Sequence, residues 1–339
     1  MNVFIDPAYK AYYENRLFDA SNTVLNRDDT LMPFIRMRDA LRAQNKTVTT
    51  ADYLHSSQDL NLCGEYYSFG LLDNIDSLLR KKNIVLKAFV VFEPPVVAPE
   101  LYMALPKLTR LFERVYVHNV IGDGYSLHNV EAHKLHKLYW PQPNDDVINR
   151  FWTRAPRLSR VVIINGNHKP RSRASELYSK RIDVMVELAK MGMVDLYGRG
   201  WKKWYSRASL WLPYWQNKRQ ILSIYKGPCD SKLDVLSQYD FCLCFENMQM
   251  HGYITEKLFD CLYAGTIPIY LGAQDISHFI PKEAYIDFRQ YSSITELCNS
   301  LLTMTECDIQ GYRQAGRLFL QSSAGMRFYN AIETIFDAQ

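Results

Sequence analysis

Short apolar runs alternate with amphipathic segments from one end of the chain to the other. Continuous apolar runs bounded by turn residues are typical of strands that are buried on both faces, and the segments between them have the periodicity of helices. Strands and helices that alternate in this way predict an α/β protein with parallel sheets. No internal repeat or low-complexity segment interrupts the pattern.

The first half of the chain contains five predicted strands, separated by helical segments such as LMPFIRMRDALRAQ and IDSLLRKK. The predicted strands are Asn2–Ile5, Thr47–Thr49, Tyr66–Gly70, Val85–Phe92 and Arg114–His118. A polar segment with three prolines, YWPQPNDDVINRFWTRAPRLSR, then precedes a new apolar run, VVIIN, and we place the domain boundary there. We expect an N-terminal domain at 1–150, a second domain at 151–310, and C-terminal helices at 311–339 that would pack back on the first domain.

The second half repeats the alternation, with five predicted strands and three predicted helices. The strands are Val161–Asn165, Val194–Tyr197, Phe241–Phe245, Ile267–Leu271 and Tyr285–Phe288, and the helices are Ser175–Lys190, Glu256–Ala264 and Ile294–Met304. This layout is typical of nucleotide-binding domains. In such open sheets, ligands bind at the carboxyl ends of the strands, beside the amino termini of the helices.

Composition excludes several classes of protein. The 339 residues are 47% hydrophobic and 22% charged, which is incompatible with a disordered, collagen-like or coiled-coil chain. A net charge of +4 gives no reason to expect nucleic acid as a partner. The seven cysteines include no Cys-x-x-Cys pair, so neither a disulfide framework nor a zinc knuckle is indicated.

The chain has no obvious targeting or membrane segment. Its first residues, MNVFIDPAYK, lack the basic start and apolar run of a secretory signal. The most apolar stretch, IVLKAFVVFEPPVV, is interrupted by Lys87 and Glu93 and is shorter than the roughly 18 to 20 apolar residues of a membrane span. We therefore expect a soluble, cytoplasmic protein.

The segment FCLCFENMQMHGYITEKLFDCLYAGTIPIYLG, from Phe241 to Gly272, carries most of the chemical information. It predicts one βαβ unit, with Glu246 and Asn247 at the carboxyl end of a buried strand. Thr255 is well placed to cap the following helix. Polar groups at a strand end beside a helix start are the expected elements of a ligand site.

Lys257 lies in the first turn of that predicted helix, where a positive charge opposes the helix dipole at a cost of about 0.3–1 kcal/mol. A bound phosphate would reverse this sign, because the lysine, the free backbone N–H groups and the dipole would all favour the same anion. Alternatively, Lys257 is solvated or pairs with Glu256 or Asp260. The spacing alone does not decide between these interpretations.

The segment closely resembles the donor-binding signature of the α-1,3/4-fucosyltransferases, glycosyltransferase family 10. That signature is an apolar strand, Phe-Glu-Asn, a short loop, Tyr-Ile/Val-Thr-Glu-Lys, and a Pro-containing strand that ends in Gly. The matching residues are Phe245, Glu246, Asn247, Tyr253, Ile254, Thr255, Glu256, Lys257, Pro268 and Gly272. Upstream, SKLDVLSQYDF is similar to the family's approach to this strand, with Lys232 and Tyr239 in matching places.

The resemblance implies a GT-B fold, in which two Rossmann-like domains with parallel sheets face a central cleft. GDP-fucose would be the donor substrate, bound by the C-terminal domain. A helix, strand and glycine turn upstream, ELYSKRIDVMVELAKMGMVDLYGRGW, resemble the family too and place Arg181 at the pyrophosphate, with Arg171 and Arg173 as alternatives. The resemblance assigns the rest of the donor site without dividing ribose, phosphate and sugar among its members, which are Gly198, Lys232, Glu246, Asn247, Tyr253 and Glu256.

Transfer with inversion, which the resemblance also implies, requires stabilisation of the departing diphosphate and removal of a proton from the acceptor. The chain contains no Asp-x-Asp motif, so we expect Arg181 and Lys257 to neutralise the diphosphate without a metal ion. The resemblance implies that the base comes from the N-terminal domain, which holds the acceptor in this family. Glu93 is our candidate, because Pro94 and Pro95 force the chain out of the sheet directly after it. A glutamate there is otherwise a solvated turn residue, and Glu100 and Asp123 remain alternatives.

A basic aromatic segment, GRGWKKWYSRASLWLPYWQNKRQILSIYK, holds four of the six tryptophans and seven basic residues but no acidic residue. The tryptophans, Trp201, Trp204, Trp211 and Trp215, could form a surface for a glycan acceptor or a membrane. They could equally pack in the interior, and the same residue types stack on single-stranded nucleic acid. A histidine-rich stretch around His118 has no common metal-ligand spacing.

These observations lead to one interpretation. We expect an inverting, metal-independent α-1,3-fucosyltransferase-like enzyme that transfers fucose from a nucleotide sugar to a glycan or lipid-linked glycan in the synthesis of surface polysaccharide or lipopolysaccharide. It would be cytoplasmic, with possible peripheral contact to the inner membrane and no nucleic-acid partner. The alternatives are a related transferase that uses another nucleotide sugar and a non-catalytic nucleotide- or glycan-binding protein on the same fold.

Overall fold

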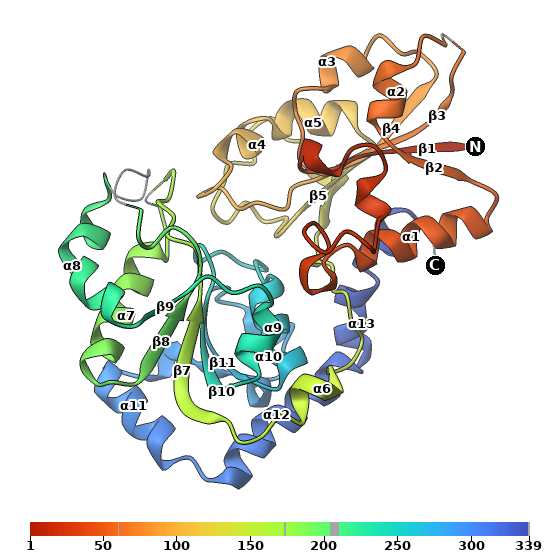
Figure 1. The fold of residues 1–339 in the computed structure, drawn as a ribbon. Coiled ribbons are helices and arrows are strands. Elements are labelled where there is room, and N and C mark those ends of the chain that lie inside the picture. Colours follow the sequence, from red (N-terminus) through yellow and green to blue (C-terminus); the bar gives the residue numbers. More distant parts are fainter. Residues whose placement is uncertain (60, 173, 204–209, 338–339) are drawn as a thin grey trace. The chain divides into compact units, whose positions relative to one another are not determined.

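The computed structural model describes residues 1–59, 61–172, 174–203 and 210–337 (Figure 1). The chain divides into two compact units, Met1–Pro143 with Arg327–Gln339, and Asn144–Met326. The first division therefore falls a few residues before the expected boundary at 150. The C-terminal part that belongs to the first unit begins at Arg327, whereas the residues from 311 to 326 belong to the second unit.

The first unit is built on a six-stranded parallel sheet with the strand order β2-β1-β3-β4-β5-β6. Five strands confirm the sequence prediction to within two residues at most ends, while β6 was not predicted because it is only three residues long. The strands are β1 (Asn2–Asp6), β2 (Thr47–Thr50), β3 (Gly64–Ser68), β4 (Ile84–Val90), β5 (Arg114–Val117) and β6 (Leu135–Lys137). The helices are α1 (Met32–Ala43), α2 (Asp52–Ser56), α3 (Ile75–Leu78), α4 (Pro99–Met103), α5 (Leu105–Leu111) and α14 (Ala331–Ile335).

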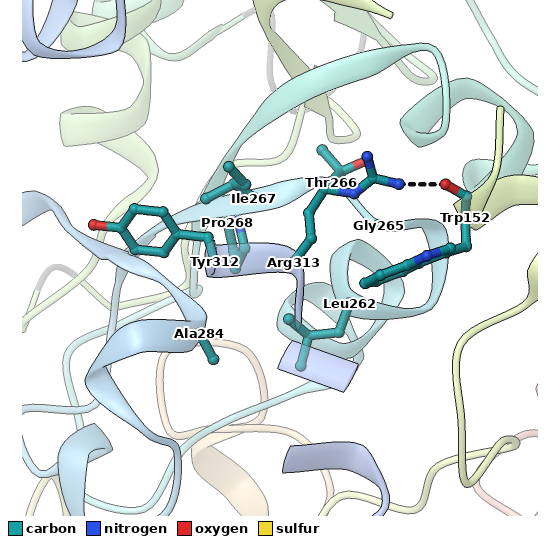
Figure 2. Close-up of a pocket in the computed structure, with 9 residues that line it drawn as sticks. All are labelled: Trp152, Leu262, Gly265, Thr266, Ile267, Pro268, Ala284, Tyr312 and Arg313. Carbon is teal, nitrogen blue, oxygen red and sulfur yellow. Dashed lines mark hydrogen bonds between the residues drawn. The ribbon is translucent and has the colours of Figure 1, made fainter. Parts of the chain in front are cut away.

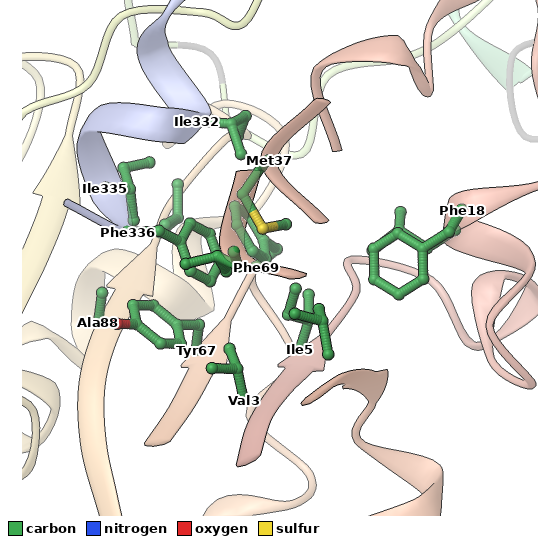
Figure 3. Close-up of a cluster of buried hydrophobic side chains, with 14 of the residues drawn as sticks. Val3, Ile5, Phe18, Met37, Tyr67, Phe69, Ala88, Ile332, Ile335 and Phe336 are labelled. Carbon is green, nitrogen blue, oxygen red and sulfur yellow. The ribbon is translucent and has the colours of Figure 1, made fainter. Parts of the chain in front are cut away.

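The end of the chain completes one core of this first unit. Figure 3 shows Ile332, Ile335 and Phe336 packed with side chains of β1, β3 and β4. The ring of Phe336 stacks on Tyr67 of β3 with 4.0 Å between centroids. Arg36 of α1 fixes the segment further, since its Nε bonds to the Glu333 carboxylate at 3.0 Å. The first unit therefore depends on residues more than 300 positions from its first strand.

The second unit contains another six-stranded parallel sheet, with the order β12-β11-β10-β7-β8-β9. Counted from β7, this is the order 3-2-1-4-5-6 of a dinucleotide-binding Rossmann fold, and the order reverses between β7 and β10. The strands are β7 (Leu158–Ile164), β8 (Val194–Tyr197), β9 (Tyr225–Gly227), β10 (Tyr239–Phe245), β11 (Ile267–Leu271) and β12 (Ile286–Asp287). The helices are α6 (Asn149–Trp152), α7 (Tyr178–Lys190), α8 (Leu212–Ser223), α9 (Lys232–Leu236), α10 (Glu256–Ala264), α11 (Ile294–Thr303) and α12 (Glu306–Leu320), and α13 (Ser323–Tyr329) follows.

The predicted βαβ unit is confirmed, with α10 and β11 at the predicted residues and β10 beginning two residues earlier than predicted, at Tyr239. Helix α10 spans the predicted residues, begins after Thr255, whose hydroxyl accepts a hydrogen bond from the Lys257 amide, and ends at Gly265 in a left-handed conformation (φ +69°). Pro268 lies inside β11, but the pairing of β11 with β12 starts only at Ile269. The missing N–H of the proline therefore removes no hydrogen bond on that side of the strand.

The structure departs from the prediction mainly in the basic aromatic segment. Its described part forms α8, followed by β9, a three-residue edge strand too short to be seen in the sequence pattern. Helix α7 begins at Tyr178, three residues later than predicted, because residues 174–177 carry the chain across the carboxyl end of the sheet.

Among the described residues, no helix is long and apolar enough to cross a membrane.

Candidate functional site

The residues singled out in the sequence gather at the carboxyl edge of the second sheet, where β8, β7 and β10 lie side by side (Figure 1). β7 leads into Asn165, β8 into Gly198, and β10 into Glu246 and Asn247. The strand order reverses between β7 and β10, and ligands of open α/β sheets bind at such a position. The topology therefore brings the predicted donor-binding segments to one place.

Gly198 is required by the close approach of two of these segments. Its φ is +138°, and a Cβ added there would lie 1.9 Å from the carbonyl oxygen of Asn165. The same carbonyl accepts a hydrogen bond from Trp201 Nε1 at 2.8 Å, and the Asn167 amide donates to the Arg199 carbonyl at 2.9 Å. The loops after β7 and β8 are thus fastened together, and only glycine fits at their closest point.

Glu246 lies in the interior of the site. Its side chain is fully buried and accepts hydrogen bonds from the Thr255 amide at 2.8 Å and the Thr255 hydroxyl at 2.9 Å. These bonds close the loop between β10 and α10. Glu246 therefore positions the start of α10, and the prediction that it contacts a donor directly finds no support in this geometry.

Lys257 is held beside this buried carboxylate. Its ammonium group lies 3.0 Å from the Thr255 hydroxyl, 3.3 Å from Glu246 Oε2 and 3.4 Å from Glu256 Oε1. Of the sequence interpretations, pairing with Glu256 is present, while Asp260 pairs with Lys232 instead. The partner Glu246, eleven positions earlier in the chain, was not anticipated. These carboxylates offset the cost of placing a lysine at the start of a helix.

The charges of this cluster shift one another's titration. Burial opposes the charged form of Lys257, but the carboxylates of Glu256 and Glu246 outweigh it and raise the pKa of the lysine. Burial also raises the pKa of Glu246, with Lys257 acting in the opposite direction. Burial alone would raise the pKa of Glu256, but the positive charges of Lys257 and Lys232 outweigh burial and lower it. Lys257 is therefore a fixed positive charge at neutral pH.

Arg181 reaches the same edge from α7. Its side chain is buried, and one guanidinium nitrogen donates to the carbonyl oxygens of Phe245 at 2.8 Å and Glu246 at 2.9 Å. Its Nε has no hydrogen-bond partner in the part of the chain that the structure describes. Burial lowers the pKa of Arg181 below its usual value. Of the alternatives to it, Arg171 is exposed and Arg173 lies outside the described residues.

The other predicted donor residues fall into two groups. Tyr253 is buried, and its hydroxyl accepts a hydrogen bond from Asn247 Nδ2 at 3.3 Å, so these two side chains line the loop before α10 together. Lys232, by contrast, forms an ion pair with Asp260 of α10. This pair links α9 to α10. Lys232 also affects the site electrostatically, because its positive charge lowers the pKa of Glu256.

Glu93 lies in the first unit, three residues after the end of β4, on a segment that turns at Pro94. It is half-buried, and its charge contributes to the raised pKa of Tyr9 and of Tyr102, whose main cause is burial. The strand thus ends at Val90, two residues before the predicted end at Phe92, and Glu93 follows it in a turn. The alternatives lie on other elements, Glu100 in the first turn of α4 and Asp123 in the loop after β5.

The four tryptophans of the basic aromatic segment do not form one surface. Trp201 and Trp211 are buried, at 2% and 6% exposure, so the prediction that they form an acceptor or membrane surface is wrong. Trp201 is held by its bond to Asn165, and Trp211 packs edge-on against Tyr178 of α7. Trp215 is 43% exposed, and Trp204 lies outside the described residues.

A small pocket elsewhere in the second unit is not part of this site. Figure 2 shows it between Trp152, Pro268 and Arg313, beside the loop that leads into β11. Because that loop precedes the strand, the pocket lies at the amino edge of the sheet, opposite to the edge where ligands of such folds bind. Arg313 there donates to the Trp152 carbonyl.

Asn167 and His168 lie at the same edge of the sheet but were not among the residues predicted from the sequence. They follow β7, and the position of a Gly-Asn-His sequence directly after a buried strand is the signal that could have indicated them. Burial, followed by the positive charge of Arg181, lowers the pKa of His168.

Within the described ranges, no group of three or more His, Cys, Asp or Glu residues could hold a metal ion.

Comparison with known proteins identifies the second unit. Residues 167–314 match the model of the Glycosyltransferase family 10 (fucosyltransferase) C-term. An α-(1,4)-fucosyltransferase of Arabidopsis thaliana is 42% identical over 62 residues, which are 18% of this chain and 16% of that protein. The α-(1,3)-fucosyltransferase FucT of Helicobacter pylori is 38% identical over 66 residues, 20% of this chain and 14% of that protein. The chain thus matches these relatives over less than a quarter of their length.

Solved structures identify the fold of the whole chain. An α1,3-fucosyltransferase has a TM-score of 0.51 at 13% identity, covering 99% of this chain and 89% of that chain. Anabaena Alr3699/HepE in complex with UDP has a TM-score of 0.56 at 12% identity, and a glycosyltransferase from Rickettsia africae ESF-5 has 0.54 at 9%, each covering 99% of this chain and 98% of that chain. The predicted GT-B fold, with two Rossmann-like units built on parallel sheets, is confirmed.

Proposed function

We propose that this chain, in which residues 167–314 belong to glycosyltransferase family 10, is an inverting glycosyltransferase that transfers a sugar from a nucleoside diphosphate to a glycan hydroxyl. The observation that carries the proposal is the strand–loop–helix from Phe245 to Lys257. It presents a fixed ammonium group and the amino terminus of α10 at the point where the strand order reverses. Both features favour a bound diphosphate.

The donor diphosphate would be bound by cations whose positions are already set. Lys257 is restrained by two carboxylates and a hydroxyl, and Arg181 is restrained by two backbone carbonyls. Groups that are oriented before the reaction stabilise developing charge without a reorganisation cost. As the bond between the sugar and the diphosphate breaks, the new charge on the leaving oxygen would be met by Lys257, by Arg181 and by the helix dipole. In this proposal no metal ion is required.

The acceptor would be activated from the first unit. An acceptor hydroxyl oxygen attacks the anomeric carbon on the face opposite to the leaving diphosphate, one C–O bond forms as the other breaks, and the hydroxyl proton passes to the base. Glu93 is our candidate for that base, since it follows β4 at the carboxyl edge of the first sheet. General base catalysis of this kind is worth about 10²- to 10⁴-fold in rate.

GDP-fucose is the donor that we propose first, because the curated relatives that match the second unit are named fucosyltransferases. A different nucleotide sugar is the alternative. The structural neighbour Alr3699/HepE was solved with UDP, and its fold is shared by this chain. The residues proposed to bind the diphosphate do not distinguish one nucleobase or sugar from another. The donor is therefore identified by experiment.

The experiment is a survey of sugar nucleotides. The purified chain is incubated with GDP-fucose, other GDP-sugars and UDP-sugars, with oligosaccharide acceptors and with EDTA, and release of the nucleoside diphosphate is measured. We expect turnover of GDP-sugars that persists in EDTA and falls in Lys257→Ala. Lys190→Ala is the matched control, because Lys190 is exposed and pairs only with Glu187 among the described contacts. Selective use of a UDP-sugar would contradict the donor, and strict dependence on a divalent ion would contradict the mechanism.

The same experiment addresses the second candidate, a non-catalytic binding protein. Tight binding of GDP without turnover of any sugar nucleotide would favour that function. Glu93→Gln then provides a separate readout, because an enzyme should lose turnover while it retains GDP binding. A non-catalytic binding protein has no turnover to lose, and its binding of GDP should be the same with and without the substitution.

We propose a lipid-linked glycan as acceptor, used in surface polysaccharide or lipopolysaccharide synthesis, and peripheral contact with the cytoplasmic face of the inner membrane. One face of α8 supports this contact. Leu212 is 64% and Trp215 43% exposed, and Lys218 lies 4.9 Å above the Trp215 ring. Arg219, one turn further along, is also exposed. Apolar and basic side chains on one helix face are typical of helices that lie at an anionic bilayer surface.

Flotation with vesicles tests this contact. The chain should float with vesicles that contain anionic lipid and not with vesicles of phosphatidylcholine alone. The variant Leu212→Gln with Trp215→Gln should reduce flotation several-fold without loss of turnover on a soluble acceptor. Equal flotation of the variant and the unchanged protein would exclude α8 as the contact.

A further inference from the structure

Asn167 has a buried side chain in the loop after β7. It is 7% exposed, and neither its Nδ2 nor its Oδ1 has a partner in the part of the chain that the structure describes. Leaving a buried donor or acceptor unsatisfied destabilises the folded protein, because the group has lost its hydrogen bonds to water and gained none. Native structures contain few such groups, and each requires an explanation.

The backbone around Asn167 is firmly held, so the position of this amide is not an accident of a loose loop. The Asn165 amide donates to the Tyr197 carbonyl at 3.0 Å, and the Asn167 amide donates to the Arg199 carbonyl at 2.9 Å. On the facing loop, Gly200 has a φ of +88°, and a Cβ added there would lie 3.5 Å from the Cβ of Asn167. The fold thus presents a planar amide opposite a residue without a side chain.

The loop of Asn167 lies beside the cations assigned to the diphosphate. This loop follows β7, the strand beside β10 in the sheet, and the pKa of the next residue, His168, is lowered first by burial and then by the charge of Arg181. Arg181 in turn donates to the carbonyls of Phe245 and Glu246 at the end of β10. A ligand whose diphosphate is bound by Arg181 and Lys257 therefore has another of its parts near Asn167.

The chemistry of the amide selects among those parts. A phosphate only accepts hydrogen bonds, so it would satisfy Nδ2 and leave the carbonyl Oδ1 buried and unpaired. A nucleobase lactam, such as the N1–H and O6 of guanine, offers one donor and one acceptor in a plane at the spacing of a carboxamide. Asparagine makes such two-bond contacts with base edges in nucleic-acid recognition. Both orphaned atoms are then satisfied by one group.

We propose that Asn167 binds the nucleobase of the donor through its lactam edge and so contributes to the choice of nucleotide. This inference rests on the proposed function, because it takes the bound ligand to be a nucleoside diphosphate. It assigns to the loop after β7 a recognition role that differs from the charge neutralisation by Arg181 and Lys257. Asn167 is thus a specificity residue that makes no contact with the reacting bond.

Calorimetry with two ligands tests the proposal. GDP and ribose 5-diphosphate share the ribose and the diphosphate but differ in the base, and both are titrated into the full chain. Asn167→Ala should weaken GDP by about 5- to 150-fold, the effect of losing two hydrogen bonds. The same variant should bind ribose 5-diphosphate within twofold of the unchanged protein. Lys257→Ala should weaken both ligands by similar factors.

Two further variants keep the result interpretable. Asn167→Leu preserves the approximate size of the side chain but removes both the donor and the acceptor, so it should weaken GDP about as much as alanine does. Asn217→Ala is the matched control on α8, where the Asn217 side chain bonds to the Pro213 carbonyl at 2.9 Å. It should leave both ligands unchanged. Thermal unfolding of each variant verifies that it is folded.

The outcomes are distinguishable. Equal weakening of GDP and ribose 5-diphosphate by Asn167→Ala would assign the residue to the ribose or the phosphates and overturn the base contact. Unchanged GDP binding would overturn any ligand contact of Asn167. If the unchanged protein bound neither ligand, the proposed function itself would be refuted, and this inference with it.

Discussion

Removing the ammonium group of Lys257 should destabilise the second unit in a way that depends on pH. In Lys257→Ala the fully buried carboxylate of Glu246 loses the cation at 3.3 Å but keeps its two hydrogen bonds from Thr255. Breaking a buried ion pair by removing one partner costs about 3–5 kcal/mol. Because Lys257 is 20% exposed and Glu246 retains two donors, we expect a smaller cost, about 2–3 kcal/mol at neutral pH.

The sign of the pH dependence follows from Glu246. Burial already raises the pKa of this carboxyl in the folded protein, and Lys257 opposes the rise. Without the lysine the pKa rises further, so the folded state binds more protons than the unfolded state over a wider range. The free energy of unfolding of the variant should therefore fall as pH increases from about 4.3, the usual glutamate value, through the raised folded value. A further rise of the folded pKa by one pH unit lowers the free energy of unfolding at high pH by about 1.4 kcal/mol.

Urea unfolding at several pH values measures this effect. The difference in unfolding free energy between the unchanged protein and Lys257→Ala should be small near pH 4 and largest near pH 8. Adding Glu246→Gln to the variant should recover part of the loss, because the amide carries no charge to bury. A difference below about 1 kcal/mol at every pH would refute the buried ion-pair account, since exposed pairs are worth about 0.2–1 kcal/mol.

The remaining predictions concern the loop junction, the base and the end of the chain. Gly198→Ala should cost about 3 kcal/mol or more in chemical unfolding, because its Cβ would meet backbone at 1.9 Å, whereas Gly192→Ala, with a φ of +68° and no atom within 4 Å, should cost only the backbone strain of about 1 kcal/mol. Glu93→Gln should lower kcat by about 10²- to 10⁴-fold while the Kd of GDP stays within twofold, and Glu100→Gln should change neither. Phe336→Ala should destabilise the first unit by about 3–5 kcal/mol, since its ring is 2% exposed and stacked, and unchanged unfolding would show that the end of the chain is dispensable there.

The elements with strong local signals could be predicted from the sequence. Helix α10 has an N-terminal cap at Thr255 and a left-handed glycine at its end, and both were visible as residue types at the right spacing. The buried strands β8 and β11 were also predicted with their observed bounds. Short edge strands such as β6 and β9 contain three residues each, which is too few to establish a periodic pattern.

The contacts that build the site could not be predicted, because they depend on loop conformation. The sequence left open whether Lys257 binds a phosphate, is solvated or pairs with Glu256 or Asp260, and Glu246 was not among its possible partners. The residues between Phe245 and Thr255 fold back and bring Glu246 to it. Trp201 and Trp211 looked like surface residues because their neighbours in sequence are basic. Their burial depends on contacts with Asn165 and Tyr178, which no local pattern reveals. The burial of Asn167 likewise depends on contacts between loops, so no local sequence pattern predicts it.

The most direct test of the central claim is a crystal structure of the chain with GDP at saturating concentration. The account predicts a diphosphate at the amino terminus of α10, with phosphate oxygens within hydrogen-bond distance of Lys257 Nζ and beside the Arg181 guanidinium. A diphosphate bound away from the carboxyl edge of β7 and β10, or no bound diphosphate at all, would contradict it.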